Sequence, residues 1–397
     1  MSTWNPIDGR VRSPFDREIR ESRAGKIGLA LGVAVLVAAV STVTGIGPAD
    51  PVNRSLGAAL VGVVFWAHLV FGTFLLKREI QGLFVIWGVV TVVFFLRFLT
   101  PGDPVTTLTP PDAGPEVREA LAERLGLDEP LHVQYGEYLW QLVQLDMGQS
   151  LQTNREVTAL IWARVPATIE LAVAATLVAV VVAIPLGVVS ARRRHGPADY
   201  GATLFSLVGI STPNFWLGIM LIIFVAVNVG FLPTGGREIG VVAALGELVF
   251  EGDVDGLVTW ISQLVLPAIT LGTFFTALIT RLTRSGMLEE IGKAYYTACQ
   301  AKGLPRTLIL YKHVLRNTLI PIVTVLGLQL GTLIGGAVIT EFVFAWPGLG
   351  RFLIDSIYAR DWTVIQGIII VIGVGFVVIN IAVDAMYAYL DPRVELQ

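Results

Sequence analysis

The chain has 397 residues, of which 54% are hydrophobic and only 15% are charged. A soluble globular protein has about 25% charged residues, so this composition indicates a chain that lies in a lipid bilayer. The net charge of −3 argues against a nucleic-acid partner, the single cysteine excludes an internal disulfide, and the four histidines lack metal-ligand spacing.

Eight apolar runs are long enough to cross the hydrocarbon core, which takes about 20 residues per helix. In chain order they cover residues 27–46, 57–76, 80–99, 168–190, 203–227, 262–280, 318–340 and 364–389. The first run is too long for a cleavable signal peptide, and a second run follows almost at once. The sequence therefore predicts an all-α integral membrane protein with about eight transmembrane helices.

The orientation of the spans follows from the basic residues beside them. Segments 1–26, 77–78, 191–196 and 281–316 are rich in lysine and arginine, whereas 101–165 and 232–261 are acidic. The basic and acidic segments alternate along all eight spans. We therefore expect both termini and segment 281–316 in the cytoplasm, and the acidic segments outside.

The external segment 101–165 is too long for a simple turn. Its "PEVREALAERLGL" has helical periodicity, and "QYGEYLWQLVQLDMGQSL" mixes aromatic, aliphatic and acidic residues. This pattern predicts short amphipathic helices that pack on the outer face.

A polar, basic stretch, "AYYTACQAKGLPRTLILYKHVLRN" at 294–317, lies between two apolar runs. Gly303 is a natural helix stop, and Pro305 suits the first turn of a second helix. That second helix carries Leu308, Tyr311 and Leu315 on one side and Arg306, His313 and Arg316 broadly opposite. Two interpretations stay open: a rigid projection that seats on a partner protein, or a connector that anchors on anionic lipid.

The seventh span carries Gly327, Gly331 and Gly335 at four-residue intervals, a stripe that permits close helix approach in lipid. The stripe fits either contact with a second subunit or a moving gate, and equally well packing within the chain. Prolines at four positions are expected to kink or begin spans: Pro185, Pro213, Pro267 and Pro321.

Ionisable residues near the spans are few: Arg97, Glu170, Glu341 and Asp384. All lie near span ends, so we expect interfacial placement, and they form no midspan chain of acids as in proton-coupled carriers. The sequence also has no phosphate-binding glycine loop, and it has no Ser/His/Asp arrangement or pair of acids typical of a catalytic site. A stand-alone secondary transporter or channel and a membrane enzyme are therefore the weaker alternatives.

Several stretches carry a close resemblance to one family. The residues "TACQAKGLPRTLILYKHVLRNTLIP" resemble the cytoplasmic coupling loop of ABC-transporter permeases of the dipeptide, oligopeptide and nickel class. Thr297, Ala298 and Cys299 occupy the positions of that family's Glu-Ala-Ala triplet and Gly303 that of its glycine, although the Glu and the second Ala are absent. In-order matches include "RFLTPGDPV", "RLGLDEPLHVQYGEYLWQLVQLDMGQSL", "RVPATIELAVAATLVAVVVAIPLGVVSARRR", "GISTPNFWLGIMLIIFVAVNVGFLPTGGR" and "EFVFAWPGLGRFLIDSIYARD". The resemblance covers roughly 80–393 and is to the first, B-type, permease subunit.

The resemblance implies a six-helix permease core at 80–397, with the external segment 101–165 and a coupling loop at 281–317. An extension at 1–79 with two further spans precedes it. The segment "FAWPGLGRFLIDSIYARD" resembles the family's external scoop, which caps the pathway or meets a binding protein. The coupling residues that it implies are Thr297, Ala298, Cys299, Lys302, Gly303, Leu304, Pro305, Arg306 and His313.

The function implied by the resemblance is that of a membrane-spanning permease subunit in an ATP-driven importer of short peptides, with nickel, oligosaccharides or glutathione as alternative cargoes. The implied partners are a second homologous permease, two cytoplasmic ABC ATPases, an extracellular or periplasmic substrate-binding protein and the bilayer of the cell (inner) membrane. We expect no cofactor or metal on this chain, because ATP and magnesium belong to the partner ATPases.

Overall fold

The computed structural model describes residues 77–98, 114–124 and 129–390. The predicted spans 27–46 and 57–76 and both termini lie outside the described residues. The described residues from Phe84 onward belong to one compact unit.

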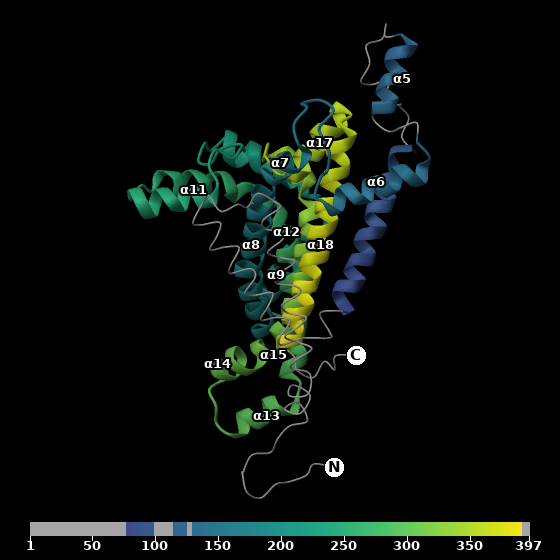
Figure 1. Ribbon diagram of the computed structural model, residues 1–397. Coiled ribbons are helices and arrows are strands. Elements are labelled where there is room, and N and C mark those ends of the chain that lie inside the picture. Colours follow the sequence, from purple (N-terminus) through teal and green to yellow (C-terminus); the bar gives the residue numbers. More distant parts are fainter. Residues whose placement is uncertain (1–76, 99–113, 125–128, 391–397) are drawn as a thin grey trace, which may run out of the picture. The chain divides into compact units, whose positions relative to one another are not determined.

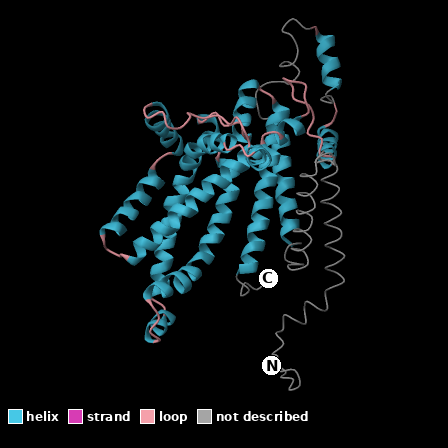
Figure 2. Ribbon diagram, turned by 90° about the vertical axis from the view of Figure 1, so that its left-hand side faces the viewer, coloured by secondary structure: helices cyan, strands magenta, loops and turns pink. Residues whose placement is uncertain are grey.

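The described residues are almost entirely helical and form no β-sheet (Figures 1 and 2). After a helix at Lys77–Phe98 come α5 (Pro115–Arg124), α6 (Leu131–Val143), α7 (Val157–Trp162), α8 (Val165–Arg192), α9 (Pro197–Ser211), α10 (Asn214–Leu221), the π-helix η1 (Ile222–Val227), α11 (Val241–Gly246) and the π-helix η2 (Glu247–Glu251). The remaining elements are α12 (Asp255–Ile291), α13 (Ala294–Ala301), α14 (Arg306–Leu308), the π-helix η3 (Ile309–Val314), α15 (Leu315–Gly336), α16 (Val338–Val343), α17 (Leu349–Ala359) and α18 (Trp362–Leu390).

Five described segments are long and apolar enough to cross a membrane: Lys77–Phe98, Val157–Arg192, Asp255–Ile291, Arg306–Leu333 and Trp362–Asp384. They correspond to five of the predicted spans. A bent pair, α9 with α10 and η1, would make a sixth. The prediction of an all-helical membrane protein is confirmed.

The predicted span 203–227 is not one straight helix, because the chain bends by 104° between α9 and α10 at Pro213, where the sequence predicted a kink or a helix start. Thr212, the residue before Pro213, has an extended backbone with ψ 124°, as the ring of a following proline favours. Pro213 also has no amide hydrogen for the Gly209 carbonyl. The other three prolines that the sequence singled out lie inside α8, α12 and α15.

Two predicted boundaries also differ from the structure. Segment 281–316 was expected to be a loop, but its first eleven residues continue α12 as far as Ile291, which gives a helix of 37 residues. That helix continues because Thr283 and Met287 are buried against its neighbours. The predicted span 318–340 ends at Gly336 and turns into α16.

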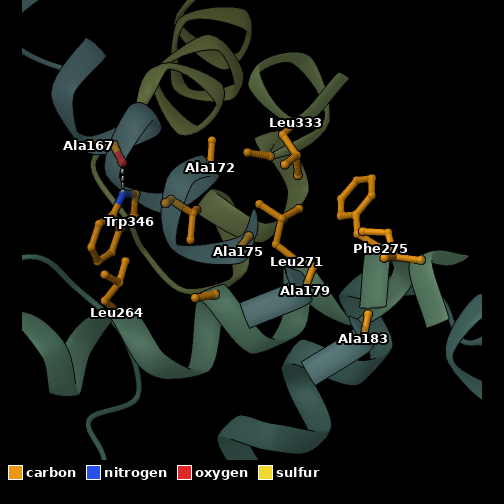
Figure 3. Close-up of a cluster of buried hydrophobic side chains, with 14 of the residues drawn as sticks. Ala167, Ala172, Ala175, Ala179, Ala183, Leu264, Leu271, Phe275, Leu333 and Trp346 are labelled. Carbon is orange, nitrogen blue, oxygen red and sulfur yellow. Dashed lines mark hydrogen bonds between the residues drawn. The ribbon is translucent and has the colours of Figure 1, made fainter. Parts of the chain in front are cut away.

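The core is formed mainly by α8 packed on α12. Alanines of α8 lie at the contact, with Leu264, Leu271 and Phe275 of α12 opposite them (Figure 3). A Cβ atom at Gly272 would lie 2.8 Å from the Ala175 carbonyl, so only glycine allows this approach. Small residues let helix backbones pack closely in lipid.

Short helices lie at both ends of the bundle. α13 and α14 lie together at one end, and α7 and α17 lie at the other (Figure 1). The predicted short helices of segment 101–165 are present as α5, α6 and α7. Tyr138 and Leu142 of α6 pack against a cluster that includes Val90, Val93 and Ile370.

Candidate functional site

A pair of short helices follows α12 at one end of the bundle. α13 ends in a Schellman motif: the Leu304 amide donates to the Cys299 carbonyl (3.3 Å) and the Gly303 amide donates to the Gln300 carbonyl (2.9 Å). Gly303 has φ +73°, a left-handed conformation that costs other residues more than glycine. Pro305 follows with an extended backbone just before α14. The helix stop and the second start thus lie where the sequence predicted them.

The inward side of this helical pair, residues 294–314, is apolar and joined to the long helices. The buried cluster comprises Tyr296 of α13, Ile309, Leu310 and Val314 of η3, Val188 and Ala191 of α8 and Met287 of α12. Cys299 and Leu304 pack against it. The pair is therefore attached to both α8 and α12 through side-chain packing.

The apolar side of the second helix is not the one that α-helical spacing suggested. Leu308 and Tyr311 are 39% and 51% exposed, and the buried residues of η3 named above face the bundle instead. A π-helix has a wider turn than an α-helix, so α-helical spacing misassigns its buried face. Leu308 and Tyr311 remain on the surface of the pair.

Glu290 connects three elements at the base of the pair. Its carboxylate pairs with Lys293 and accepts hydrogen bonds from the Tyr295 hydroxyl (2.8 Å) and the Asn317 amide (3.3 Å). Burial, together with the hydrogen bond to Glu290, raises the pKa of Tyr295 to about 12. The sequence analysis did not single out Glu290, because an acidic residue in a helix beside a basic segment gives no sign that it bonds to several elements.

The predicted coupling residues divide between two sides of the pair. The exposed ones are Thr297, Ala298, Lys302, Gly303, Pro305 and Arg306. The half-buried ones are Cys299, Leu304 and His313. Leu304 packs inward with Cys299, so it shapes the pair from within and offers less of its side chain to a partner.

A basic pocket of about 220 Å³ opens beside the pair. Its lining consists of Tyr295, Lys312, His313, Arg316 and Asn317. Among the described residues, neither Lys312 nor Arg316 forms an ion pair. The pocket therefore suits an anionic group.

Asp199 joins α8, α9 and α12 near the same end. Its carboxylate accepts a two-pronged interaction from Arg284 (2.6 and 2.9 Å), and further hydrogen bonds from the Ser190 hydroxyl (2.6 Å) and the His195 amide (2.9 Å). Its side chain is only 4% exposed. Bidentate Arg–carboxylate geometry fixes both partners, so this pair holds the three helices in register.

At the opposite end, Glu170 of α8 fastens the segment between η1 and α12. It accepts two hydrogen bonds from Arg237 (2.8 and 2.9 Å), one from the Trp260 indole (3.1 Å) and one from the Val241 amide (3.1 Å). The sequence listed Glu170 only as an ionisable residue at a span end. Its partners lie 67 to 90 residues away along the chain, which spacing alone does not reveal.

Glu341 is fully buried, which corrects the expected interfacial placement. It accepts hydrogen bonds from the Thr168 hydroxyl (2.7 Å) and the amides of Gly350 (2.7 Å) and Arg351 (3.1 Å). Burial raises the pKa of Glu341. The carboxyl group thus joins α8 to the start of α17, the helix of the predicted external scoop.

Arg97 and Asp384 are the other two ionisable residues that the sequence analysis singled out. Arg97 hydrogen-bonds Gln134 and lies 4.8 and 4.6 Å from the rings of Phe94 and Phe98. Asp384 is half-buried in α18. The described residues contain no group of three or more potential metal ligands.

The glycine stripe of α15 faces α18 within the same chain. A Cβ atom at Gly327 would overlap Val383, and one at Gly331 would lie 3.0 Å from Phe376. At Gly335 the nearest atom would be 3.9 Å away, on Ile372. The first two glycines therefore permit the close α15–α18 contact, and the third leaves more space.

Comparison with known proteins gives two family matches. Residues 183–396 match the binding-protein-dependent transport system inner membrane component, and residues 71–172 match the N-terminal membrane-component region of such systems. Residues before 71 lie outside both matches.

Curated relatives match over nearly their full length. The chain is 42% identical to the dipeptide transport system permease protein DppB of Alkalihalophilus pseudofirmus, covering 78% of this chain and 96% of that protein. It is 38% identical to the oligopeptide transport system permease protein AppB of Bacillus subtilis (81% and 99%) and to DppB of Escherichia coli K12 (77% and 94%). A solved structure of the MetNI methionine ABC transporter in an inward-facing conformation matches with 21% identity and a TM-score of 0.45, covering 58% of this chain and 96% of that chain.

Proposed function

The chain belongs to the family of binding-protein-dependent transport system inner membrane components, and on that basis we propose that it is the permease subunit of an importer for dipeptides or oligopeptides. The observation that carries the cargo proposal is the set of relatives at 38–42% identity, which are named for dipeptide or oligopeptide transport. A transport subunit of this kind has no catalytic residues of its own. ATP and magnesium would then bind the partner ATPases.

The helical pair 294–314 is the proposed docking element for a cytoplasmic ATPase. Its exposed residues include two small ones, Ala298 and Gly303, and two with apolar side chains, Leu308 and Tyr311. Its inward side is fixed to α8 and α12 by the buried cluster. A partner that grips the outer side would therefore move the pair together with both long helices.

Transmission to the far side of the membrane would follow α12. This helix runs without interruption through 37 residues, about 55 Å, from Asp255 to the base of the pair. Arg284 of α12 is bonded to Asp199, so α8 and α9 would follow its movement. ATP-driven closure of two ATPases would thus tilt the bundle as a rigid body and change the access to the pathway.

The remaining partners and the orientation follow from the same proposal. A second permease would complete the pathway, two ATPases would bind the helical pairs, and a binding protein would deliver cargo to the end that carries α7 and α17. The basic pair would face the cytoplasm of the inner membrane, in agreement with the positive-inside rule, and both termini would lie on that side.

Purification of the complex with Gly303→Asp tests the coupling proposal. Asp adopts φ +73° about as well as Asn does and adds a charge on the exposed side, so we expect the ATPases to be lost while the second permease is retained. Gly303→Asn is the matched control, because Asn tolerates the left-handed conformation without the charge. Retention of the ATPases by Gly303→Asp would overturn the docking assignment.

Uptake assays test the cargo. The whole transporter, with its binding protein, should accumulate labelled dipeptides or oligopeptides in proteoliposomes that contain ATP inside. Accumulation of nickel, oligosaccharide or glutathione with no peptide uptake would overturn the peptide assignment and leave the permease assignment intact.

A further inference from the structure

The break between α9 and α10 leaves backbone groups without partners. Within the described residues, the carbonyls of Ile210, Ser211 and Thr212 and the amides of Asn214, Phe215 and Trp216 form no hydrogen bond to protein. Pro213 has no amide hydrogen to offer. In the described part of the chain, the backbone bonds at the break run from the Thr212 amide to the Val208 carbonyl (2.9 Å) and from the Leu217 amide to the Pro213 carbonyl (3.1 Å).

The break lies beside the uncharged part of α12, a helix that is long and apolar enough to cross a membrane. A Cβ atom at Gly209, just before it, would lie 2.9 Å from Ala277, and one at Gly218, just after it, would lie 3.3 Å from Thr270. Both contacts fall within the stretch of α12 between Asp255 and Arg281, which has no charged residue. At 1.5 Å per residue the break is roughly 11 Å from the level of Arg281.

Unpaired backbone groups at this depth need water or protein around them. Each unsatisfied group costs several kcal/mol in hydrocarbon, so irregular backbone in membranes is found only where it is buried in protein or lines an aqueous cavity. Ser211 and Pro213 are exposed, and Thr212 and Asn214 are half-buried, so the break is not buried within this chain. Three of these four side chains are polar, in contrast to the apolar residues of α10 that follow.

We propose that residues 211–214 line the water-filled translocation pathway at membrane depth. This inference rests on the proposed function, since it assigns the pathway wall of the same transporter. Water in the pathway would satisfy the free carbonyls and amides when no cargo is present. The pathway wall at this level would consist of backbone and small polar side chains. Such a wall does not discriminate between the side chains of different peptides, so cargo selectivity would have to reside elsewhere.

Cysteine accessibility in the complete transporter tests the proposal. Because Cys299 is the single cysteine, Cys299→Ser gives a chain without thiols, to which Ser211→Cys or Asn214→Cys is added one at a time. The matched controls are Leu207→Cys, one turn earlier in α9 and 64% exposed, and Phe224→Cys in η1, 59% exposed. Each variant is reconstituted with its partners and treated with a charged methanethiosulfonate reagent, with and without ATP.

We expect the cysteines at 211 and 214 to react at least ten-fold faster than the controls in one of the two nucleotide states. Slow reaction at all four positions in both states would overturn the proposal, because the break would then face lipid or the second permease. A cross-link to the second permease from position 211 without reagent access would overturn it in the same way. Peptide uptake by the Cys299→Ser transporter is measured first, so a failure of the proposed function is seen separately from a failure of the labelling.

Discussion

The Tyr295 hydroxyl in α13 donates a 2.8 Å hydrogen bond to the Glu290 carboxylate in α12, and this contact fixes the helical pair to that 37-residue helix. Asn317 of α15 donates to the same carboxylate, so one side chain joins the helix before the pair to the helix after it. A movement imposed on α13 would therefore reach α12 and α15 together.

Replacement of Glu290 by alanine should uncouple ATP hydrolysis from transport. The change leaves the Tyr295 hydroxyl and the Asn317 amide without their acceptor, and the pair is then attached mainly by apolar packing. We expect uptake per ATP hydrolysed to fall several-fold in proteoliposomes while the complex still assembles. Glu289→Ala is the matched control, because that neighbouring carboxylate is 76% exposed and lies 3.8 Å from Lys293. Equal losses in both variants would show that Glu290 has no special role.

The raised pKa of Tyr295 predicts a dependence of stability on alkaline pH. A pKa of about 12 in the folded chain lies above the ordinary tyrosine value of 10, so the folded state holds this proton more tightly than the unfolded state. The resulting stabilisation is complete below pH 10 and is lost as the pH rises from 10 to 12. In Tyr295→Phe, the melting temperature of the detergent-solubilised chain should fall less between pH 9 and 11 than in the wild type. Tyr311→Phe, at an exposed position, should behave as the wild type does.

A structural feature of this chain is predictable from the sequence when the residues that determine it lie close together along the chain. Apolar run length predicts five of the described spans, and the glycine and proline chemistry at Gly303 and Pro305 predicts the form of the helical pair, because both signals are local. A kink or helix start at Pro213 is also a local signal and was predicted, but the size of the bend was not, because an apolar run reads the same whether it is straight or broken. Glu290, Asp199 and Asp361 were missed as hubs because their partners come from other elements; Asp361, for example, accepts a 2.5 Å hydrogen bond from Ser150.

The Asp199–Arg284 pair should show a measurable energetic coupling. Removing either partner of the bidentate pair leaves the other without its counter-charge, and Asp199→Ala also removes the acceptor of the Ser190 and His195 bonds. We expect Asp199→Ala and Arg284→Ala each to lower stability, and the double variant to be less destabilised than the sum, with a coupling of about 1–3 kcal/mol. A thermal-unfolding double-mutant cycle measures this coupling, and strict additivity would contradict the structural role of the pair.

Glu341 should position the external helix α17. Glu341→Ala leaves the amides of Gly350 and Arg351 without an acceptor at a buried site, at a cost of about 1–3 kcal/mol each. We expect faster hydrogen exchange in α17 and easier tryptic cleavage at Arg351 and Arg360, with the helical pair at the other end unchanged. Glu341→Gln retains an acceptor oxygen and should show a smaller effect. If both variants exchange as the wild type does, the carboxyl group does not hold the helix.

The glycines of α15 should differ in their tolerance of a methyl group. A Cβ atom at Gly327 would overlap Val383, so Gly327→Ala must push α15 away from α18 or displace that side chain. At Gly335 the nearest atom would be 3.9 Å away, an ordinary contact, and alanine is favoured over glycine within a helix by roughly 0.5–1 kcal/mol. We therefore expect Gly327→Ala to lower the melting temperature of the solubilised chain and Gly335→Ala to leave it unchanged or raise it. Because both substitutions add the same single carbon to the same helix, a fall of equal size in the two variants would mean that a general property of α15, and not its close contact with Val383, sets the requirement for glycine.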